Sequence, residues 1–198
     1  MQHNQLSRDH RAGMRKFMDQ YSIMLITVVM IAIATLLQGT TFLSLSNFIN
    51  IIRSNSVVGI IAFGMSLVII SGHIDLSVGA QMVLVASVSI DVVNRTGSAV
   101  LGVLAAFAFS CTLSLMTGLI VTKGRVPSFI VTLGLQYIYR SILIYSLNGG
   151  GTTTSNAGYA SISNYSLFGW LPLQIHYFFI MAAIFWFVSK RTVLGRHI

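Results

Sequence analysis

Long apolar runs separated by short polar connections make up most of this chain. The runs extend over Tyr21–Leu37, Val57–Val93, Ala99–Thr122, Val126–Leu147 and Leu167–Val188. Each has about the 17–25 residues that a helix needs to cross the hydrocarbon core of a bilayer, or more. None alternates strictly between apolar and polar positions, as the strands of a membrane β-barrel do. The pattern therefore predicts an all-α, polytopic membrane protein, because helices satisfy their backbone polar groups internally.

The run Val57–Val93 is too long to be a single crossing. One continuous helix of this length would measure roughly 55 Å. We expect it to turn at Ser71–Gly79, where polar residues and glycines interrupt the apolar sequence and Asp75, with Ser77 two residues on, suits the cap of a second arm. The two arms form either a full hairpin or a re-entrant pair that meets partway across the bilayer. We expect the re-entrant pair, because the glycines and serine of the turn suit a backbone that lines a cavity. The chain would then have about six transmembrane or re-entrant helices.

The composition agrees with a membrane solvent. Of 198 residues, 55% are hydrophobic and 8% are charged, and the mean hydropathy is +0.80. Soluble domains carry about 25% charged residues. The net charge of +8 does not indicate a nucleic-acid-binding protein, since the cations lie in short clusters between the apolar runs. The single cysteine, Cys111, excludes a disulfide framework, and no cluster of residues has metal-ligand spacing.

The distribution of Lys and Arg predicts the orientation of the chain. Nine cations lie on one side of the expected crossings, at Arg8, Arg11, Arg15, Lys16, Lys123, Arg125, Lys190, Arg191 and Arg196. The other side holds Arg53 and Arg95, and the loop Asn148–Ser166 there is uncharged. Cytoplasmic connections are the ones rich in Lys and Arg. We therefore expect residues 1–20 to be a basic cytoplasmic tail and residues 21–198 to be a membrane domain in a bacterial inner membrane.

The turn residues resemble a known family signature. Ser71-Gly72-His73-Ile74-Asp75-Leu76-Ser77-Val78-Gly79 is similar to the Gly-Gly-Ile-Asp-Leu-Ser-Val-Gly motif of permease subunits of bacterial ABC monosaccharide importers of the ribose/arabinose/xylose/allose type. Further similarity lies in Ile60–Ile70, in the proline-led stretch Val126–Gly134 that runs on to Arg140, and in Thr192-Val193-Leu194-Gly195-Arg196. The resemblance extends over nearly the whole chain. It implies that Thr192, Gly195 and Arg196 begin the loop that docks on the ATPase.

This sequence departs from the family pattern at two points. His73 stands where the family has its second glycine, which adds a titratable group to the turn. The chain also stops at Ile198, where the family continues through the docking segment into further helices. The resemblance therefore implies the N-terminal portion of a permease, from either a truncated gene or a fragment.

Two polar residues within the apolar runs stand out as candidates for the solute path. Arg140 lies 13 residues beyond Pro127, roughly 20 Å along a helix that starts at the cytoplasmic face. An arginine at the centre of a bilayer costs about 2.5–3.5 kcal/mol and must pair, snorkel or face water. Gln136, four residues earlier, shares its helix face. A structural ion pair and a snorkelling position are the alternatives to a role for Arg140 in the solute path. The candidate path or gate residues are Asp75, Ser77, Gln136 and Arg140.

The resemblance implies a permease subunit of an ATP-driven, binding-protein-dependent monosaccharide importer and no catalytic residue in this chain. ATP would act through a separate ATPase subunit, which agrees with the absence of a P-loop motif from the sequence. The implied partners are a second permease subunit, that ATPase and a periplasmic sugar-binding protein. A permease of a branched-chain amino-acid importer is the alternative. A membrane-embedded hydrolase, with Ser77 and His73 as nucleophile and base, is a remote one.

Overall fold

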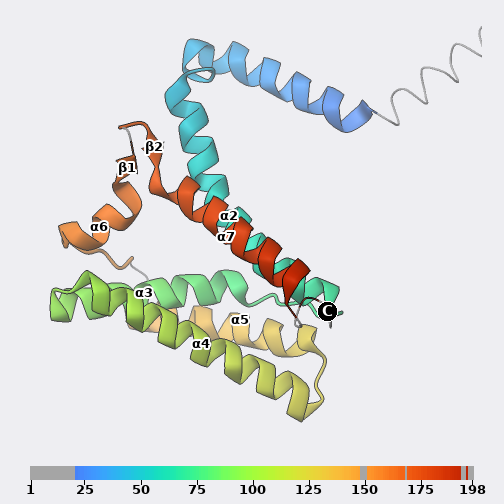
Figure 1. Cartoon of the computed structure of the whole chain (residues 1–198), viewed down its shortest axis with the longest axis vertical. Helices are drawn as coiled ribbons and strands as arrows, with labels where there is room; N and C mark the ends of the chain where they lie inside the picture. The colour runs from blue at the N-terminus through green and yellow to red at the C-terminus, as the bar shows by residue number, and fades with distance from the viewer. Residues whose placement is uncertain (1–20, 148–150, 168, 193–194, 196–198) are drawn as a thin grey trace, which may run out of the picture. The chain divides into compact units, whose positions relative to one another are not determined.

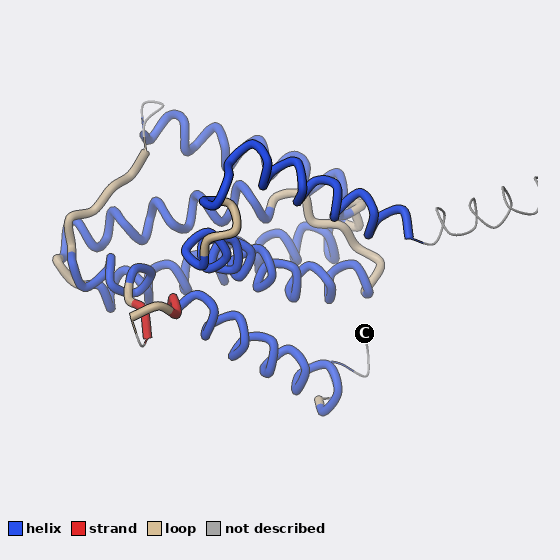
Figure 2. The backbone as a smooth tube through the Cα atoms, turned by 90° about the horizontal axis from the view of Figure 1, so that it is seen from above, coloured by secondary structure: helices blue, strands red, loops and turns tan. Residues whose placement is uncertain are grey.

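The computed structural model describes residues 21–147, 151–167, 169–192 and 195. After a first helix over residues 21–38 come the elements η1 (Gly39–Thr41), α2 (Leu45–Ile70), α3 (Val78–Thr96), α4 (Ala99–Gly124), α5 (Ser128–Leu147), α6 (Ala157–Asn164), β1 (Ser166–Leu167), β2 (Leu171–Pro172) and α7 (Leu173–Arg191). Strands are confined to the β1–β2 pair among the described residues (Figure 2). The chain divides into two compact units, Met1–Ile51 and Ile52–Ile198, which are described separately.

The first unit holds an apolar helix and the start of α2. The helix over residues 21–38 buries none of its apolar side chains, as expected of a segment that faces lipid. It ends at Gly39, whose φ of +60° is a left-handed conformation that glycine adopts without strain. Ser44 then caps α2, since its hydroxyl accepts a hydrogen bond from the backbone N–H of Asn47 at 3.2 Å.

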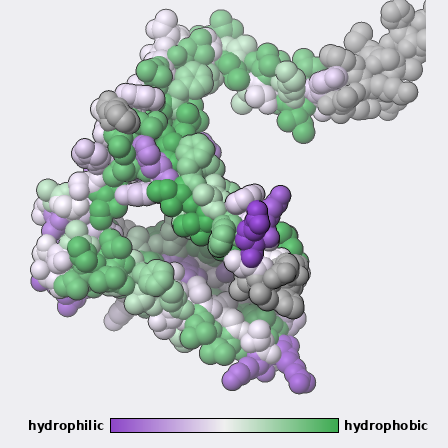
Figure 3. All heavy atoms as spheres, viewed as in Figure 1, coloured by the Kyte–Doolittle hydropathy of each residue, from purple (hydrophilic) through white to green (hydrophobic). Residues whose placement is uncertain are grey.

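Six helices of the described residues are long and apolar enough to cross a membrane, which confirms the predicted fold class. They are Tyr21–Thr41, Leu45–Ile70, Val78–Thr96, Ala99–Gly124, Ser128–Leu147 and Leu173–Arg191. Apolar atoms accordingly cover most of the visible helix surfaces (Figure 3). Two boundaries differ from the prediction. α2 starts twelve residues before Val57, and α7 starts six residues after Leu167.

The predicted break within Val57–Val93 is confirmed, with α2 ending at Ile70 and α3 beginning at Val78. α2 has 26 residues, roughly 39 Å of helix, and α3 has 19, roughly 28 Å. Each arm is therefore long enough for a full crossing. These lengths favour the full hairpin over the re-entrant pair that we expected. The apolar run alone underestimated the first arm, because α2 continues through the polar residues 53–56.

Helices α3, α4 and α5 pack into a bundle in the second unit (Figure 1). Its core holds Leu84, Leu113 and Tyr139, one residue from each helix. At Gly102 of α4 the two helices α3 and α4 approach closely. A Cβ added there would collide with the side chain of Val93 and lie 3.2 Å from the backbone oxygen of Ser89. Small residues of this kind allow close helix packing in membranes, where lipid gives helices no hydrophobic reason to associate.

Helices α2 and α7 form a second contact, through aromatic rings. Phe63 of α2 stacks on Phe178 and Phe185 of α7, with ring centroids 5.3 Å apart in both pairs. Gly59 makes room for the Phe178 ring, which a Cβ at that position would overlap. Residue numbers rise together along the two helices, so α2 and α7 run in the same direction.

The segment between α5 and α7 contains structure that the sequence did not predict. We expected an uncharged loop over Asn148–Ser166, but α6 forms within it and the β1–β2 hairpin follows (Figure 1). Asn156 caps α6 by accepting the backbone N–H of Tyr159 at 2.9 Å. The Tyr159 hydroxyl reaches the buried Ser89 of α3 at 2.8 Å. The segment is thus tied to the ends of α3 and α4. Residues 148–150 of the expected loop lie outside the described residues.

Candidate functional site

The turn between α2 and α3 is held together by Asp75. One carboxylate oxygen of Asp75 accepts the backbone N–H of Ser77 at 2.8 Å and the hydroxyl of Ser77 at 2.6 Å. Ser77 is the N-cap residue of α3 and is fully buried. Gly72, at φ +80°, makes the reversal that ends α2. The N-cap of α3 is thus at Ser77 as expected, and Asp75 holds it, but the Ser77 side chain makes no cap hydrogen bond to α3 itself.

Two side chains near the start of α5 form hydrogen bonds to the backbone of this turn. The hydroxyl of Ser128 accepts the backbone N–H of Ile74, and that of Thr132 accepts the backbone N–H of Leu76, both at 3.2 Å. Thr132 is 2% exposed and lies 3.2 Å from the carbonyl oxygen of Ile74 as well. Side chains of α5 thus satisfy backbone N–H groups of the turn that no helix pairs.

A cavity of about 320 Å³ opens beside the turn. Its polar lining is rich in hydroxyl groups and includes one carboxylate and one imidazole: Ser71, His73, Asp75, Ser114, Thr117, Thr122, Ser128 and Thr132. Val68, Ile74, Gly118 and Val121 complete it. We call this cavity the turn pocket. Its volume lies within the roughly 300–1,000 Å³ typical of small-molecule sites.

Gln136 and Arg140 line a different depression, between α3 and α5. This α3–α5 groove has a volume of about 570 Å³ and is completed by Gly79, Ala80, Val83, Leu143 and Ile144. The shared helix face that we predicted for Gln136 and Arg140 is confirmed. Arg140 is exposed and lies 12 residues into α5, roughly 18 Å from its start.

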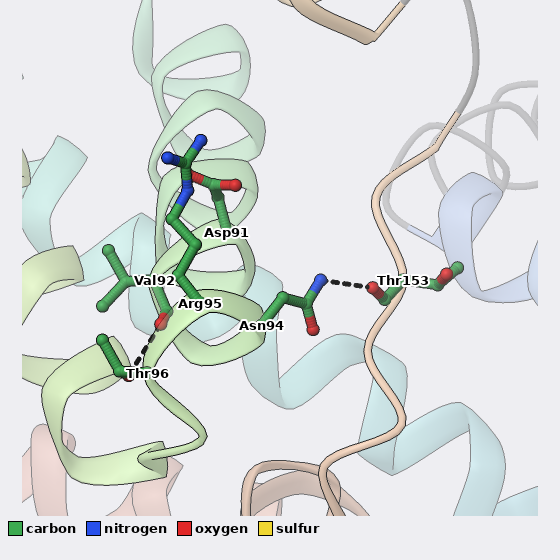
Figure 4. Close-up of polar contacts among 6 residues, drawn as sticks. All are labelled: Asp91, Val92, Asn94, Arg95, Thr96 and Thr153. Carbon is green, nitrogen blue, oxygen red and sulfur yellow. Dashed lines mark hydrogen bonds and ion pairs between the residues drawn. The ribbon is translucent and has the colours of Figure 1, made fainter.

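The structural ion pair considered for Arg140 does not involve Asp91. The carboxylate of Asp91 binds Arg95, one turn further along α3, at 2.8 Å (Figure 4). Both side chains are more than half exposed. In the part of the chain that the structure describes, no salt bridge of Arg140 is found. Of the roles considered for Arg140, a snorkelling position and the solute path agree with this.

The structure thus brings the four candidate path residues together only in part. Asp75 lies at the turn pocket, whereas Gln136 and Arg140 lie at the α3–α5 groove. Ser77 lines neither cavity, because it is buried and its hydroxyl donates a hydrogen bond to Asp75. The same geometry leaves Ser77 inaccessible as a nucleophile, which counts against the hydrolase alternative. His73 is exposed at the pocket.

The sequence reasoning missed Gln81, which is a buried polar residue of α3. Its side-chain nitrogen donates to the hydroxyl of Ser114 at 3.1 Å and to the backbone oxygen of Ser110 at 3.4 Å, both on α4. A lone glutamine within an apolar run was the available signal. Hydrogen bonds of this kind join membrane helices at modest gain, roughly 0.6 kcal/mol on average.

Two of the three residues assigned to the start of the docking loop are described. Thr192 ends α7, and its hydroxyl donates to the carbonyl oxygen of Val188 at 2.6 Å. The same hydroxyl accepts the backbone N–H of Gly195 at 3.4 Å. Arg196 lies outside the described residues. The local geometry at Thr192 is the end of α7, held by its own hydroxyl.

The cations at the helix ends of the second unit fall on two opposite sides of it, while Arg140 lies within α5. The turn before α3 and the start of α5 share one end, through the bond between Ile74 and Ser128. Lys123, Arg125, Lys190 and Arg191 belong to helix ends on that side. Arg95 closes α3 at the other end, where Asn94 donates to the backbone oxygen of Thr153 at 2.9 Å (Figure 4). This division matches the charge asymmetry seen in the sequence. The cations of residues 1–20 lie outside the described residues.

The family to which the chain belongs is shown by a match over most of its length. Residues 47–198 match the model of the family described as branched-chain amino acid transport system / permease component. The chain belongs to this family. The family description and the six candidate spans together support a multi-pass membrane protein of the transport permease class.

Curated relatives in the family carry the names of sugar permeases. The ribose import permease protein RbsC of Escherichia coli (strain K12) is 35% identical over 189 residues, which cover 91% of this chain and 57% of that protein. The L-arabinose ABC transporter permease protein AraH of Azospirillum brasilense is 24% identical over 188 residues, or 95% of this chain and 55% of that protein. The xylose transport system permease protein XylH of Haemophilus influenzae is 35% identical over 151 residues, which cover 72% of this chain and 40% of that protein. The chain thus spans 57%, 55% and 40% of the lengths of these three relatives. No solved structure matches it.

Proposed function

We propose that this chain is the membrane-spanning permease subunit of an ATP-driven, binding-protein-dependent importer of a monosaccharide. The observation that carries the proposal is the match to the ribose import permease over 91% of the chain, which includes the whole turn and α5. The similar relatives named for ribose, arabinose and xylose favour a pentose or a related sugar. ATP would be bound and hydrolysed by a separate subunit.

The alternative substrate is a branched-chain amino acid. The family description supports it, because that description names amino-acid transport. The names of the similar relatives count against it, since they include ribose, arabinose and xylose permeases. The substrate therefore separates the two proposals, while the arrangement of helices suits both.

The cation distribution supports a cytoplasmic position for the end that carries Lys123, Arg125, Lys190 and Arg191. In this orientation the turn pocket opens at the cytoplasmic side, and α6 with the β1–β2 hairpin lies at the outer side. A periplasmic sugar-binding protein would deliver sugar from that outer side. The ATPase would engage the cytoplasmic end, where Thr192, Gly195 and Arg196 begin the proposed docking loop.

The α3–α5 groove is the part of the described surface that best fits a solute path. Arg140 and Gln136 offer hydrogen-bond donors and an amide oxygen to sugar hydroxyls. Gly79 and Ala80 leave room beside them. An arginine exposed to lipid costs about 2.5–3.5 kcal/mol. Arg140 avoids this cost if it faces a water-filled path. Asp75 serves the inner end, and Ser77 positions its carboxylate.

Identification of the partners tests the proposal. The protein would carry an affinity tag at its N-terminus and be purified in mild detergent from the membranes of the cells that make it. Mass spectrometry should find a periplasmic binding protein with it. Calorimetry on that binding protein should show affinity for a pentose and none for leucine. Binding of leucine in place of sugar would move the chain to the amino-acid alternative.

A further inference from the structure

The turn pocket has an unusual balance of hydrogen-bond donors and acceptors. The hydroxyl protons of four lining residues are already used by carbonyl oxygens of their own helices. Ser71 donates to Val68 at 2.7 Å, Thr117 to Leu113 at 2.9 Å, Thr122 to Gly118 at 2.7 Å and Thr132 to Ser128 at 2.8 Å. A hydroxyl oxygen has two acceptor sites, so oxygens whose protons are engaged can present only lone pairs to a ligand.

Asp75 adds negative charge to this acceptor surface. Both hydrogen bonds from Ser77 go to the same carboxylate oxygen, Oδ1. Hydrogen bonds to the other oxygen, Oδ2, are absent from the described residues, although Asp75 lies at the pocket wall. An ionised carboxylate accepts at both oxygens and donates at neither. Oδ2 therefore keeps its lone pairs for a further donor, and a carboxylate accepts more strongly than a hydroxyl oxygen.

The remaining wall is apolar. Val68, Ile74 and Val121 contribute aliphatic surface, and Gly118 leaves room against α4. A fitting ligand brings hydrogen-bond donors to these oxygens and a C–H face to the aliphatic wall, and its own oxygens can accept from Ser114, Ser128 and His73. A monosaccharide ring has both, since its hydroxyls donate while its ring carbons present C–H groups.

We infer that the turn pocket is a monosaccharide subsite at the inner end of the transport path, with Asp75 Oδ2 and the hydroxyl oxygens as acceptors for sugar hydroxyls. This inference rests on the proposed function for the choice of sugar over other donor-rich ligands. The subsite is distinct from the α3–α5 groove, because the two share no lining residue. It differs in charge too, since Arg140 brings a cation to the groove and Asp75 brings a carboxyl group to the turn pocket.

The inference predicts a specific ligand preference. D-Ribose carries free hydroxyls and can donate to the pocket, whereas fully O-methylated ribose retains the ring and oxygens but cannot donate. Ribose should therefore bind and its methylated form should not. A small cation would compete for the same acceptors, so sodium and ammonium chloride serve as comparison ligands.

Protection of a single cysteine against a thiol reagent measures occupancy. The reporters are Thr122→Cys and Ser71→Cys, each in a Cys111→Ala background, in the 198-residue chain purified in detergent so that both ends are accessible. A small, charged maleimide labels the cysteine in the presence of increasing D-ribose. Lys123→Cys is the matched control, because Lys123 is exposed beside Thr122 and does not line the pocket.

D-Ribose should slow labelling of both reporters at least threefold and leave Lys123→Cys unchanged. O-Methylated ribose should protect neither. Asp75→Asn, combined with a reporter, should raise the ribose concentration for half-protection about tenfold, because a hydrogen bond to a charged group is lost. Asn still offers an oxygen to the Ser77 N–H, and an unchanged elution volume in size-exclusion chromatography would show that the variant is folded.

Several outcomes would overturn the subsite. These are labelling that ribose does not slow, equal protection by O-methylated ribose, and equal protection by sodium or ammonium. Co-purification of the binding protein, and calorimetry on it, distinguish a wrong subsite from a wrong proposed function. An unprotected pocket beside a co-purified pentose-binding protein would refute only the subsite. An unprotected pocket beside a leucine-binding protein would refute both.

Discussion

Thr132 and Leu76 are joined by a hydrogen bond of 3.2 Å between the Thr132 hydroxyl and the Leu76 backbone N–H. The two residues are 56 positions apart in the sequence, and the bond ties the turn before α3 to the first turn of α5. Thr132 is almost fully buried, so no water replaces this partner easily. The conformation of the signature turn therefore depends on α5 as much as on its own sequence.

Replacing Thr132 by valine should destabilise the protein. The shape of the side chain is kept, but the acceptor for the Leu76 N–H is lost, which costs about 1–3 kcal/mol for a buried donor. Thr112→Val is the matched control, because Thr112 also bonds the carbonyl four residues back but is exposed on α4. The control should stay within about 0.5 kcal/mol of wild type. Thermal unfolding in detergent, followed by circular dichroism, compares the two. An equal loss of stability in both variants would show that the hydrogen bond between Thr132 and Leu76 does not contribute to stability.

Removing the Asp75 carboxylate should also weaken the turn. Asp75→Ala deletes the acceptor of both Ser77 bonds at the start of α3, and loss of such a cap costs about 0.5–2 kcal/mol. Asp91→Ala provides the comparison, because its ion pair with Arg95 is exposed and such pairs contribute about 0.3–0.5 kcal/mol. The same unfolding assay should rank Asp75→Ala clearly below Asp91→Ala. The reverse order would contradict the role of Asp75 in the cap.

Two glycines of α4 give opposite predictions for the same substitution. Gly102→Ala places a methyl group against Val93 and Ser89, and overpacking of this kind costs about 1–3 kcal/mol. Gly118→Ala meets no atom within 4 Å, and alanine in a helix is favoured over glycine by roughly 0.5–1 kcal/mol. Unfolding temperatures should therefore fall for the first variant and hold or rise for the second. A rise for Gly102→Ala would mean that α3 and α4 do not approach closely there.

The charge distribution predicts the orientation of the chain, which fusion reporters test. Alkaline phosphatase is active only outside the cytoplasm, so fusions within Asn148–Ser166 should be highly active. Fusions after Lys123 or Arg196 should show low activity, because these cations mark the cytoplasmic side. High activity after Arg196 would reverse the orientation.

The apolar pattern was enough to predict the helices but not their ends. The run near Val57 seemed to start where the polar residues 53–56 stop, yet α2 begins at Leu45. The hydroxyl of Ser56 donates to the carbonyl of Ile52, so the helix itself satisfies a polar residue that interrupts the hydropathy pattern. Arg53 likewise donates to Asn164, a contact that no local pattern predicts.

The candidate site was predictable where it is local and unpredictable where it is tertiary. The cap at Asp75 and Ser77 follows from their spacing, and the shared face of Gln136 and Arg140 follows from the helical repeat. The separation of Asp75 from Gln136 and Arg140, at two different cavities, depends on how α5 packs beside α3 and α4. The hydrogen bond between Gln81 and Ser114 depends on the same packing. Such contacts join residues more than 30 positions apart, which periodicity does not relate.

The central claim is that the protein imports a monosaccharide, and uptake by living cells tests it most directly. Cells with and without the intact gene would be given radiolabelled D-ribose, L-arabinose, D-xylose or L-leucine at low concentration. The account predicts that deletion abolishes energised uptake of at least one of the sugars, that the plasmid-borne gene restores it, and that leucine uptake is unchanged. Loss of leucine uptake, with uptake of all three sugars intact, would contradict the account.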